Sequence, residues 1–132
     1  NFASRLATLL EKGAKVAFSN HYLIDEHGAR LDDASKQHTA LFHQAELSAG
    51  LLAQPERSVW QNAIPASASL LRVADVRRLR FKEDLNTPEI ELFLRLAREG
   101  GTFVFTPEYL AEYRVHPASA TGAGLWGDRL AR

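Results

Sequence analysis

Residues 86 to 101 read NTPEIELFLRLAREGG, and they predict an amphipathic helix over residues 88–99. Thr87 suits the N-cap, Pro88 suits the first helical position, and Gly100 suits the end of the helix. The apolar side chains recur three and four residues apart, so one face of the helix is expected to pack inward: Ile90, Phe93, Leu94 and Ala97.

Two acidic side chains, Glu89 and Glu91, stand in the first turn of this predicted helix. An anion in a first turn is favoured by about 0.3–1 kcal/mol through the helix dipole. Both acids therefore have a purely structural explanation, and the local pattern by itself favours that explanation over a catalytic one.

The segments around this helix predict an α/β domain. Strand patterns occur near residues 14–19, 66–72, 102–106 and 109–115. Further helices are expected over residues 2–12 and 39–53, and Pro55 is expected to end the second of these. The tail over residues 117–132 is rich in Gly, Ala and Ser and is predicted to be flexible.

The composition excludes several classes of function. The 132 residues include 16 Lys plus Arg and 16 Asp plus Glu, so no net field draws the chain toward nucleic acid. Cysteine is absent, which excludes disulfides, thiolate metal sites and cysteine nucleophiles. The absence of cysteine leaves the redox compartment open and favours the cytoplasm. No apolar run approaches the roughly 20 residues that cross a bilayer.

The histidines show no metal-binding spacing. His38 and His43 are five residues apart, which misses the i, i+4 pair of a helical metal site. Arg114 and His116 close the segment EYRVHP, where they could serve an anionic ligand or simply cap a strand at the edge of a sheet. The residue pattern alone therefore predicts an α/β domain without an assigned role.

A longer stretch, residues 62–121, resembles the C-terminal half of a family 2 glycosyltransferase of the GT-A type. It reads NAIPASASLLRVADVRRLRFKEDLNTPEIELFLRLAREGGTFVFTPEYLAEYRVHPASAT. The matches are Ser67 to Arg72, Phe81 to Leu85, Glu91-Leu92 with Arg95-Leu96, Gly100-Gly101, and Tyr113-Arg114 with His116. The resemblance implies that residues 1–116 are part of a Rossmann-like mixed sheet with flanking helices, from which the N-terminal nucleotide-binding half is missing.

Such enzymes transfer a sugar from a nucleotide-sugar donor to an acceptor hydroxyl, usually with inversion. The resemblance implies that Glu89 is the general base, at a position where aspartate is usual, while Pro88 replaces the family's other acid. It also implies that a divalent cation, Mn²⁺ or Mg²⁺, offsets the charge of the leaving diphosphate, with His116 near the metal. By the same resemblance, the substrate-binding residues would be Asn62, Ser67, Glu91 and Arg114.

The family's Asp-x-Asp motif, which holds the metal and the diphosphate, has no counterpart in this sequence. We therefore expect an acceptor-side part of a longer enzyme, inactive alone and without a tightly bound cation. Its acceptor would be a saccharide or a lipid-linked sugar, so the parent could be associated with a membrane.

Two other interpretations stay open. The altered acids at Pro88-Glu89 suit a non-catalytic module that binds a saccharide or a protein, and the individual motifs are weak enough for a chance resemblance. Loss of the other strands would expose a sheet edge, which predicts self-association.

Overall fold

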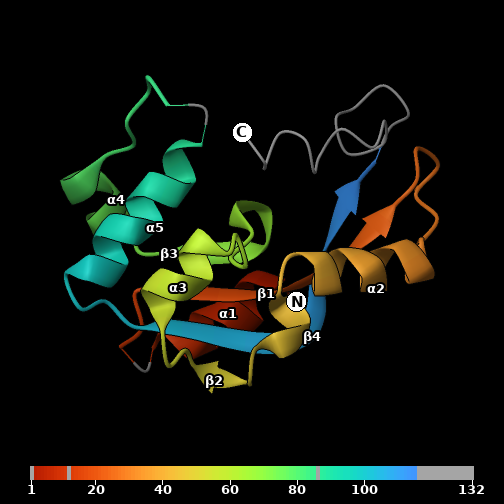
Figure 1. Ribbon diagram of the computed structural model, residues 1–132, viewed down its shortest axis with the longest axis horizontal. Helices are drawn as coiled ribbons and strands as arrows, with labels where there is room; N and C mark the ends of the chain where they lie inside the picture. The colour runs from red at the N-terminus through yellow and green to blue at the C-terminus, as the bar shows by residue number, and fades with distance from the viewer. Residues whose placement is uncertain (1, 12, 86, 116–132) are drawn as a thin grey trace.

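The structure is a computed structural model, and it describes residues 2–11, 13–85 and 87–115 of the chain. Helices cover both faces of a mixed β-sheet (Figure 1). Along the sequence the elements are α1 (Phe2–Leu10), β1 (Val16–Ile24), α2 (Asp32–Leu41), the 3-10 helix η1 (Gln44–Glu46), β2 (Gly50–Leu51), α3 (Pro55–Trp60), the 3-10 helix η2 (Ala66–Ala68), β3 (Ser69–Leu71), α4 (Val73–Leu79), α5 (Pro88–Arg98) and β4 (Phe103–Arg114). The predicted α/β class, with a mixed sheet and flanking helices, is confirmed.

The four strands of the sheet lie in the order β2-β4-β1-β3. Its centre is the parallel pair β1 and β4, which begins with Val16 opposite Phe103 and ends with Ile24 opposite Arg114. The short strands β3 and β2 pair antiparallel with the outer sides of β1 and β4. Because the two central strands run the same way, their C-terminal ends meet at one end of the sheet.

The register of the central pair is irregular near its middle, around Ser19, Asn20 and His21. Pro107 of β4 has no N–H to donate to a strand ladder, and it lies at this irregularity. The side-chain amide of Asn20 donates a hydrogen bond of 3.0 Å to the Pro107 carbonyl and bridges the break. The sequence predicted separate strands on the two sides of this proline, but the structure joins them in the single strand β4.

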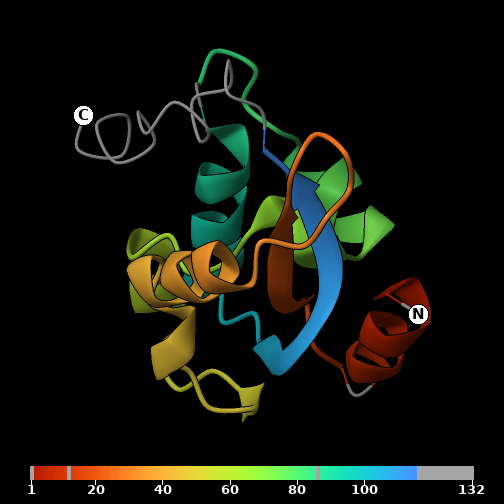
Figure 2. The ribbon, with the colours of Figure 1, turned by 90° about the vertical axis from the view of Figure 1, so that its right-hand side faces the viewer.

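Side chains alternate along a strand, so the two faces of the sheet carry different apolar cores. Against one face pack α3 and α5, and this core consists of Val16, Phe18, Val59, Ile64, Phe93, Leu94, Leu96, Phe103 and Phe105. Against the other face packs α1, with a core of Leu6, Leu10, Ala14, Ala17 and Val104. Figure 2 shows α1 on one side of the sheet and α2, α3 and α5 on the other.

The predicted helix over residues 88–99 is confirmed as α5, with Gly100 at φ +88° just beyond its end. Its apolar face is buried as expected, and Phe93 is 1% exposed. Burial of a side chain of this size stabilises the fold by about 1.5–3 kcal/mol. The helix is therefore fixed to the sheet, and its N-terminus has a defined position.

The predicted helix over residues 39–53 is wrong. The helix in this region, α2, begins at Asp32 and ends at Leu41, and His43 then adopts a left-handed conformation with φ 63°. Pro55 does not end a helix but begins α3, because its fixed φ and missing N–H suit a first helical position. Of the apolar residues that suggested one continuous period, Leu41 lies in α2 and Ala45 in η1, whereas Phe42, Ala49 and Leu52 lie in the connections between elements.

No helix in the described ranges is both long enough and apolar enough to cross a membrane. His116 and the predicted flexible tail lie outside the described residues.

Candidate functional site

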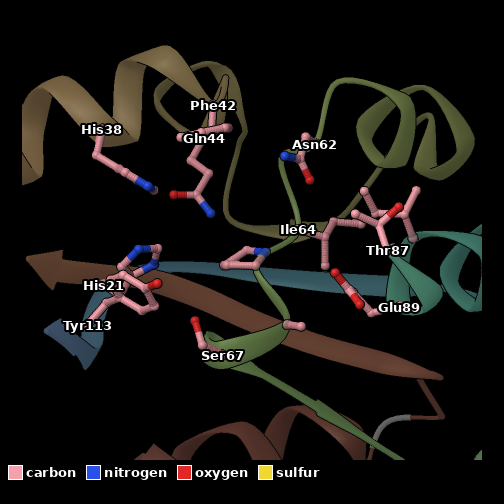
Figure 3. A pocket seen from close by; sticks show the side chains of 13 residues that line it. His21, His38, Phe42, Gln44, Asn62, Ile64, Ser67, Thr87, Glu89 and Tyr113 are labelled. Carbon is pink, nitrogen blue, oxygen red and sulfur yellow. The ribbon is translucent and has the colours of Figure 1, made fainter. Parts of the chain in front are cut away.

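A cavity of about 250 Å³ lies between α2, the C-terminal half of β1 and the N-terminus of α5 (Figure 3). Ligand pockets typically have volumes from about 300 Å³ upward, so this cavity suits a small ligand. Its walls are mainly apolar, with several convergent polar groups. The lining residues are His21, His38, Phe42, Gln44, Asn62, Ile64, Pro65, Ala66, Ser67, Thr87, Glu89, Ile90 and Tyr113.

Glu89 stands at one end of this cavity, on the first turn of α5 (Figure 3). Thr87 is the N-cap residue, and its carbonyl accepts a hydrogen bond of 3.2 Å from the Ile90 N–H. The positive end of the helix dipole favours a carboxylate at this position. Glu89 is half-buried, and its side chain borders the cavity.

Asn62 and Ser67 approach the same cavity on the segment between α3 and β3. Asn62 has a left-handed backbone with φ 59°, a conformation that asparagine tolerates better than most residues. Its N–H donates to the Val59 carbonyl at 2.9 Å, and the buried Ile64 anchors the segment behind it. Glu89, Asn62 and Ser67, three of the residues that the resemblance indicated, therefore line one cavity.

The opposite end of the cavity holds two histidines, His21 from β1 and His38 from α2 (Figure 3). Their rings meet edge to face with centroids 4.8 Å apart, and the His38 ring also lies 4.4 Å from that of Phe42. Burial lowers the pKa of His21. Burial, and then the nearby His21, lowers the pKa of His38 to about 4, so this end of the cavity is uncharged at neutral pH.

Three polar atoms at this end are buried without a hydrogen-bond partner: His21 Nδ1, His38 Nδ1 and Gln44 Oε1. His21 is 4% exposed and Gln44 is 2% exposed. The side-chain amide of Gln44 donates to the Ala63 carbonyl at 3.0 Å, which fixes the direction of its free oxygen. An unsatisfied buried polar group costs about 1–3 kcal/mol, so such a cluster at a cavity wall indicates a place where a ligand could supply the missing bonds.

Sequence reasoning missed this histidine end for two reasons. Strict alternation along β1 would put His21 on the sheet face opposite Phe18, but the irregular register between them lets His21 line the cavity on the face of Phe18. His38 lay outside the predicted helix, whereas it belongs to the last turn of α2.

Glu91, a predicted substrate-binding residue, does not line the cavity. Its carboxylate accepts a hydrogen bond of 2.9 Å from Arg95 Nε and lies 3.8 Å from Lys82 Nζ. Arg95 in turn donates to the carbonyls of Leu79 and Arg80, each at 2.6 Å. The pair thus ties the end of α4 to α5.

Arg114, another predicted substrate-binding residue, also has its contacts elsewhere. Its guanidinium donates to the carbonyls of Asp25 and Glu26 at 3.1 and 2.8 Å, in the turn that follows β1. His116, the predicted metal ligand, lies outside the described residues.

The cavity does not offer the donor set of a hard divalent cation. Among residues 2–11, 13–85 and 87–115, no group of three or more His, Asp or Glu side chains is arranged to hold a metal ion. Mg²⁺ and Mn²⁺ prefer several oxygen ligands, and Glu89 is the one carboxylate among the residues that line the cavity.

Comparison with known proteins finds no protein-family model, no curated protein and no solved structure that matches this chain.

Proposed function

We propose that this chain is the acceptor-side part of a nucleotide-sugar-dependent glycosyltransferase of the GT-A type, which transfers a sugar to an acceptor hydroxyl with inversion. The single observation that supports the proposal most strongly is the common cavity of Glu89, Asn62 and Ser67. They come from two segments, the connection between α3 and β3 and the first turn of α5, and the family resemblance indicates all three.

The reaction needs one base on the acceptor side. In the proposed mechanism, the Glu89 carboxylate accepts the proton of an acceptor hydroxyl. The hydroxyl oxygen forms a bond to the anomeric carbon of the donor sugar, and the bond from that carbon to the diphosphate breaks on the opposite face. The electron pair leaves with the nucleoside diphosphate, and the configuration at the anomeric carbon inverts.

Asn62 and Ser67 would orient the acceptor in this mechanism. An amide and a hydroxyl each donate and accept hydrogen bonds, so they match the hydroxyl groups of a sugar. Positioning of this kind is important because a displacement of about 1 Å at the reacting groups can lower the rate by about 10²-fold.

The donor half, with its acidic metal motif, would be supplied by sequence outside these 132 residues. The divalent cation would there offset charge on the leaving diphosphate, and no residue of the described cavity is assigned to it. By this proposal the 132-residue chain alone neither binds UDP tightly nor transfers sugar.

A transfer assay tests the proposal. The longer polypeptide is incubated with radiolabelled UDP-, GDP- and TDP-sugars, Mn²⁺ and a panel of saccharide acceptors. The proposal predicts a labelled glycoside from at least one donor, with the anomeric configuration opposite to that of the donor. Free sugar or no product from every donor would contradict it.

A non-catalytic saccharide-binding module is the second candidate. The observation that favours it is the solitary carboxylate in the cavity, combined with proline at the position of the family's other acid. Under this alternative the saccharide binds in the same cavity but does not react there. Glu89→Gln would then change only the affinity for the saccharide, and the transfer rate would stay unchanged.

A further inference from the structure

The histidine end of the cavity has an unused hydrogen-bonding capacity that the proposed chemistry at Glu89 does not require. His21 Nδ1, His38 Nδ1 and Gln44 Oε1 are all buried, and none has a partner within the described part of the chain. Figure 3 shows the side chains of His38 and Gln44 extending from one wall toward the strand that carries His21. Native structures leave few such groups unsatisfied, so their concentration at one cavity wall marks a place where a bound molecule would complete their hydrogen bonds.

The chemistry of these groups selects the ligand. Each neutral imidazole has one N–H donor and one acceptor nitrogen, and the amide oxygen of Gln44 is an acceptor. A hydroxyl group donates one hydrogen bond and accepts others, so adjacent hydroxyls can satisfy both kinds of atom. An ionised carboxylate can only accept, so placed against Gln44 Oε1 it would leave that oxygen without a donor.

The charges around the cavity also favour a neutral ligand over an anion. No lysine or arginine is among its lining residues, and the one charged group there is the Glu89 carboxylate. Burial keeps the pKa values of His21 and His38 below their ordinary range, so neither ring supplies a positive charge at neutral pH. An anion would therefore lose its water without gaining a counter-charge.

The remaining walls suit the carbon skeleton of a small ring. Phe42 and Tyr113 flank the histidines, and Tyr113 is 38% exposed. A few placed polar groups against aromatic and aliphatic walls are typical of small-molecule sites. The cavity volume of about 250 Å³ limits the occupant to about one such ring.

We propose that His21, His38 and Gln44 form a recognition subsite for a neutral, hydroxylated ligand the size of one sugar ring. The subsite rests on the proposed function in one respect: it would hold the acceptor sugar whose hydroxyl is directed to Glu89. It excludes acidic sugars and sugar phosphates from this position. The two histidines bind the ligand and do not take its proton, because burial lowers the pKa of both rings, that of His38 to about 4.

The test is a titration of the 132-residue chain, labelled with ¹⁵N, in which the imidazole nitrogens of His21 and His38 are observed. The probes are glucose, galactose, mannose and N-acetylglucosamine, with glucuronate and galacturonate as matched anions. A sugar of about 12 non-hydrogen atoms at drug-like efficiency binds with a Kd in the millimolar range. The expected result is a saturable shift of both imidazoles with at least one neutral sugar, and a Kd at least about tenfold weaker for the uronates.

Matched variants locate the binding. His38→Phe keeps a ring beside Phe42 and removes both nitrogens, so it should weaken binding by about tenfold. His27→Phe makes the same change at a side chain that is 82% exposed outside the cavity, and it should leave the Kd within about twofold. Gln44→Met removes the free oxygen at similar volume and provides a second test if His38→Phe does not fold.

The inference is overturned if no neutral sugar gives a saturable shift, if the uronates bind as well as the neutral sugars, or if the cavity variants behave like His27→Phe. The titration contains no donor nucleotide, so it tests the subsite alone. Sugar binding at the histidines, combined with no transfer by the longer polypeptide, would contradict the proposed function and leave the subsite intact. Transfer by the longer polypeptide, without sugar-dependent shifts at the histidines, would overturn the subsite and support the proposed function.

Discussion

His21 and His38 meet edge to face in the interior, with ring centroids 4.8 Å apart, although they come from a strand and a helix separated by a turn. The contact joins α2 to the C-terminal half of β1 and forms one wall of the cavity. Both rings are neutral at pH 7 because burial lowers their pKa values. The pair therefore stabilises the fold only while it remains unprotonated.

The first prediction concerns stability and pH. In the unfolded chain a histidine has a pKa near 6.5, whereas the folded pKa of His38 is about 4. As the pH falls from about 6.5 to 4, the unfolded state binds protons that the folded state does not bind, so the free energy of unfolding decreases. We expect a loss of at most ~1.4 kcal/mol per pH unit for each histidine, measured by urea unfolding between pH 7 and pH 4.5.

His38→Phe isolates this effect from the carboxylates that also titrate in acid. The variant should lose less stability than the parent over the same pH interval, because one of the two titrating rings is gone. His27→Phe, at an exposed position, should follow the parent. Equal pH dependence for all three proteins would show that the pair does not control acid stability.

The second prediction concerns Asp75, which is 5% exposed on α4. Burial by itself would raise the pKa of this carboxyl, but the hydrogen bond from Arg78 at 3.0 Å and the charge of Lys15 at 3.4 Å outweigh burial and lower it. Arg78→Ala should lower the free energy of unfolding by about 1–3 kcal/mol, because it removes the principal partner of a buried charge. Arg77→Ala, at an exposed site on the same helix, should change it by less than about 0.5 kcal/mol in thermal unfolding.

The third prediction concerns Arg95, which joins α5 to the carbonyls of Leu79 and Arg80. Arg95→Ala should destabilise the chain by about 1.5–3 kcal/mol, because it removes hydrogen bonds from a charged donor in a half-buried position. Arg98, also on α5, forms a more exposed ion pair with Glu56 of α3. Arg98→Ala should lower the free energy of unfolding by only about 0–1 kcal/mol. Chemical denaturation that ranks the two variants equally would contradict the structural role of Arg95.

The fourth prediction is self-association through the sheet edge. On the outer side of β4, β2 pairs only with Val104 and Phe105, so the part of β4 beyond Phe105 has no strand partner on that side within the described residues. Unpaired strand edges template pairing with another chain. Sedimentation velocity should show a weight-average mass that rises with protein concentration, and a monomer at every concentration would contradict this expectation.

The elements that the sequence predicted correctly are those with local signals. Helix α5 begins at Pro88 and is followed by Gly100 at positive φ, and both signals act within a few residues of the helix ends. The alternation in β1 was equally readable over Val16 and Phe18. Such signals can be read from a few neighbouring residues of the sequence, without knowledge of tertiary contacts.

The elements that the sequence did not predict depend on contacts between distant residues. Helix α2 is held by the Thr39 hydroxyl, which lies 3.0 Å from that of Tyr109, and by Ser35, whose hydroxyl accepts a hydrogen bond from the Leu23 N–H at 2.7 Å. The shifted register that brings His21 into the cavity involves Pro107, far along the chain. The residues at the Glu89 end were therefore accessible from a motif, whereas the histidine end required the fold.

The fifth prediction tests the central claim, that Glu89 removes the acceptor proton. In the longer polypeptide, with nucleotide sugar and acceptor at saturation, Glu89→Gln should lower kcat by about 10²–10⁴-fold, because an amide cannot accept the proton. Glu83→Gln, in the exposed loop before α5, is the matched control and should leave kcat within about twofold. A rate for Glu89→Gln equal to that of Glu83→Gln would contradict the assignment of Glu89 as the base and favour the non-catalytic module.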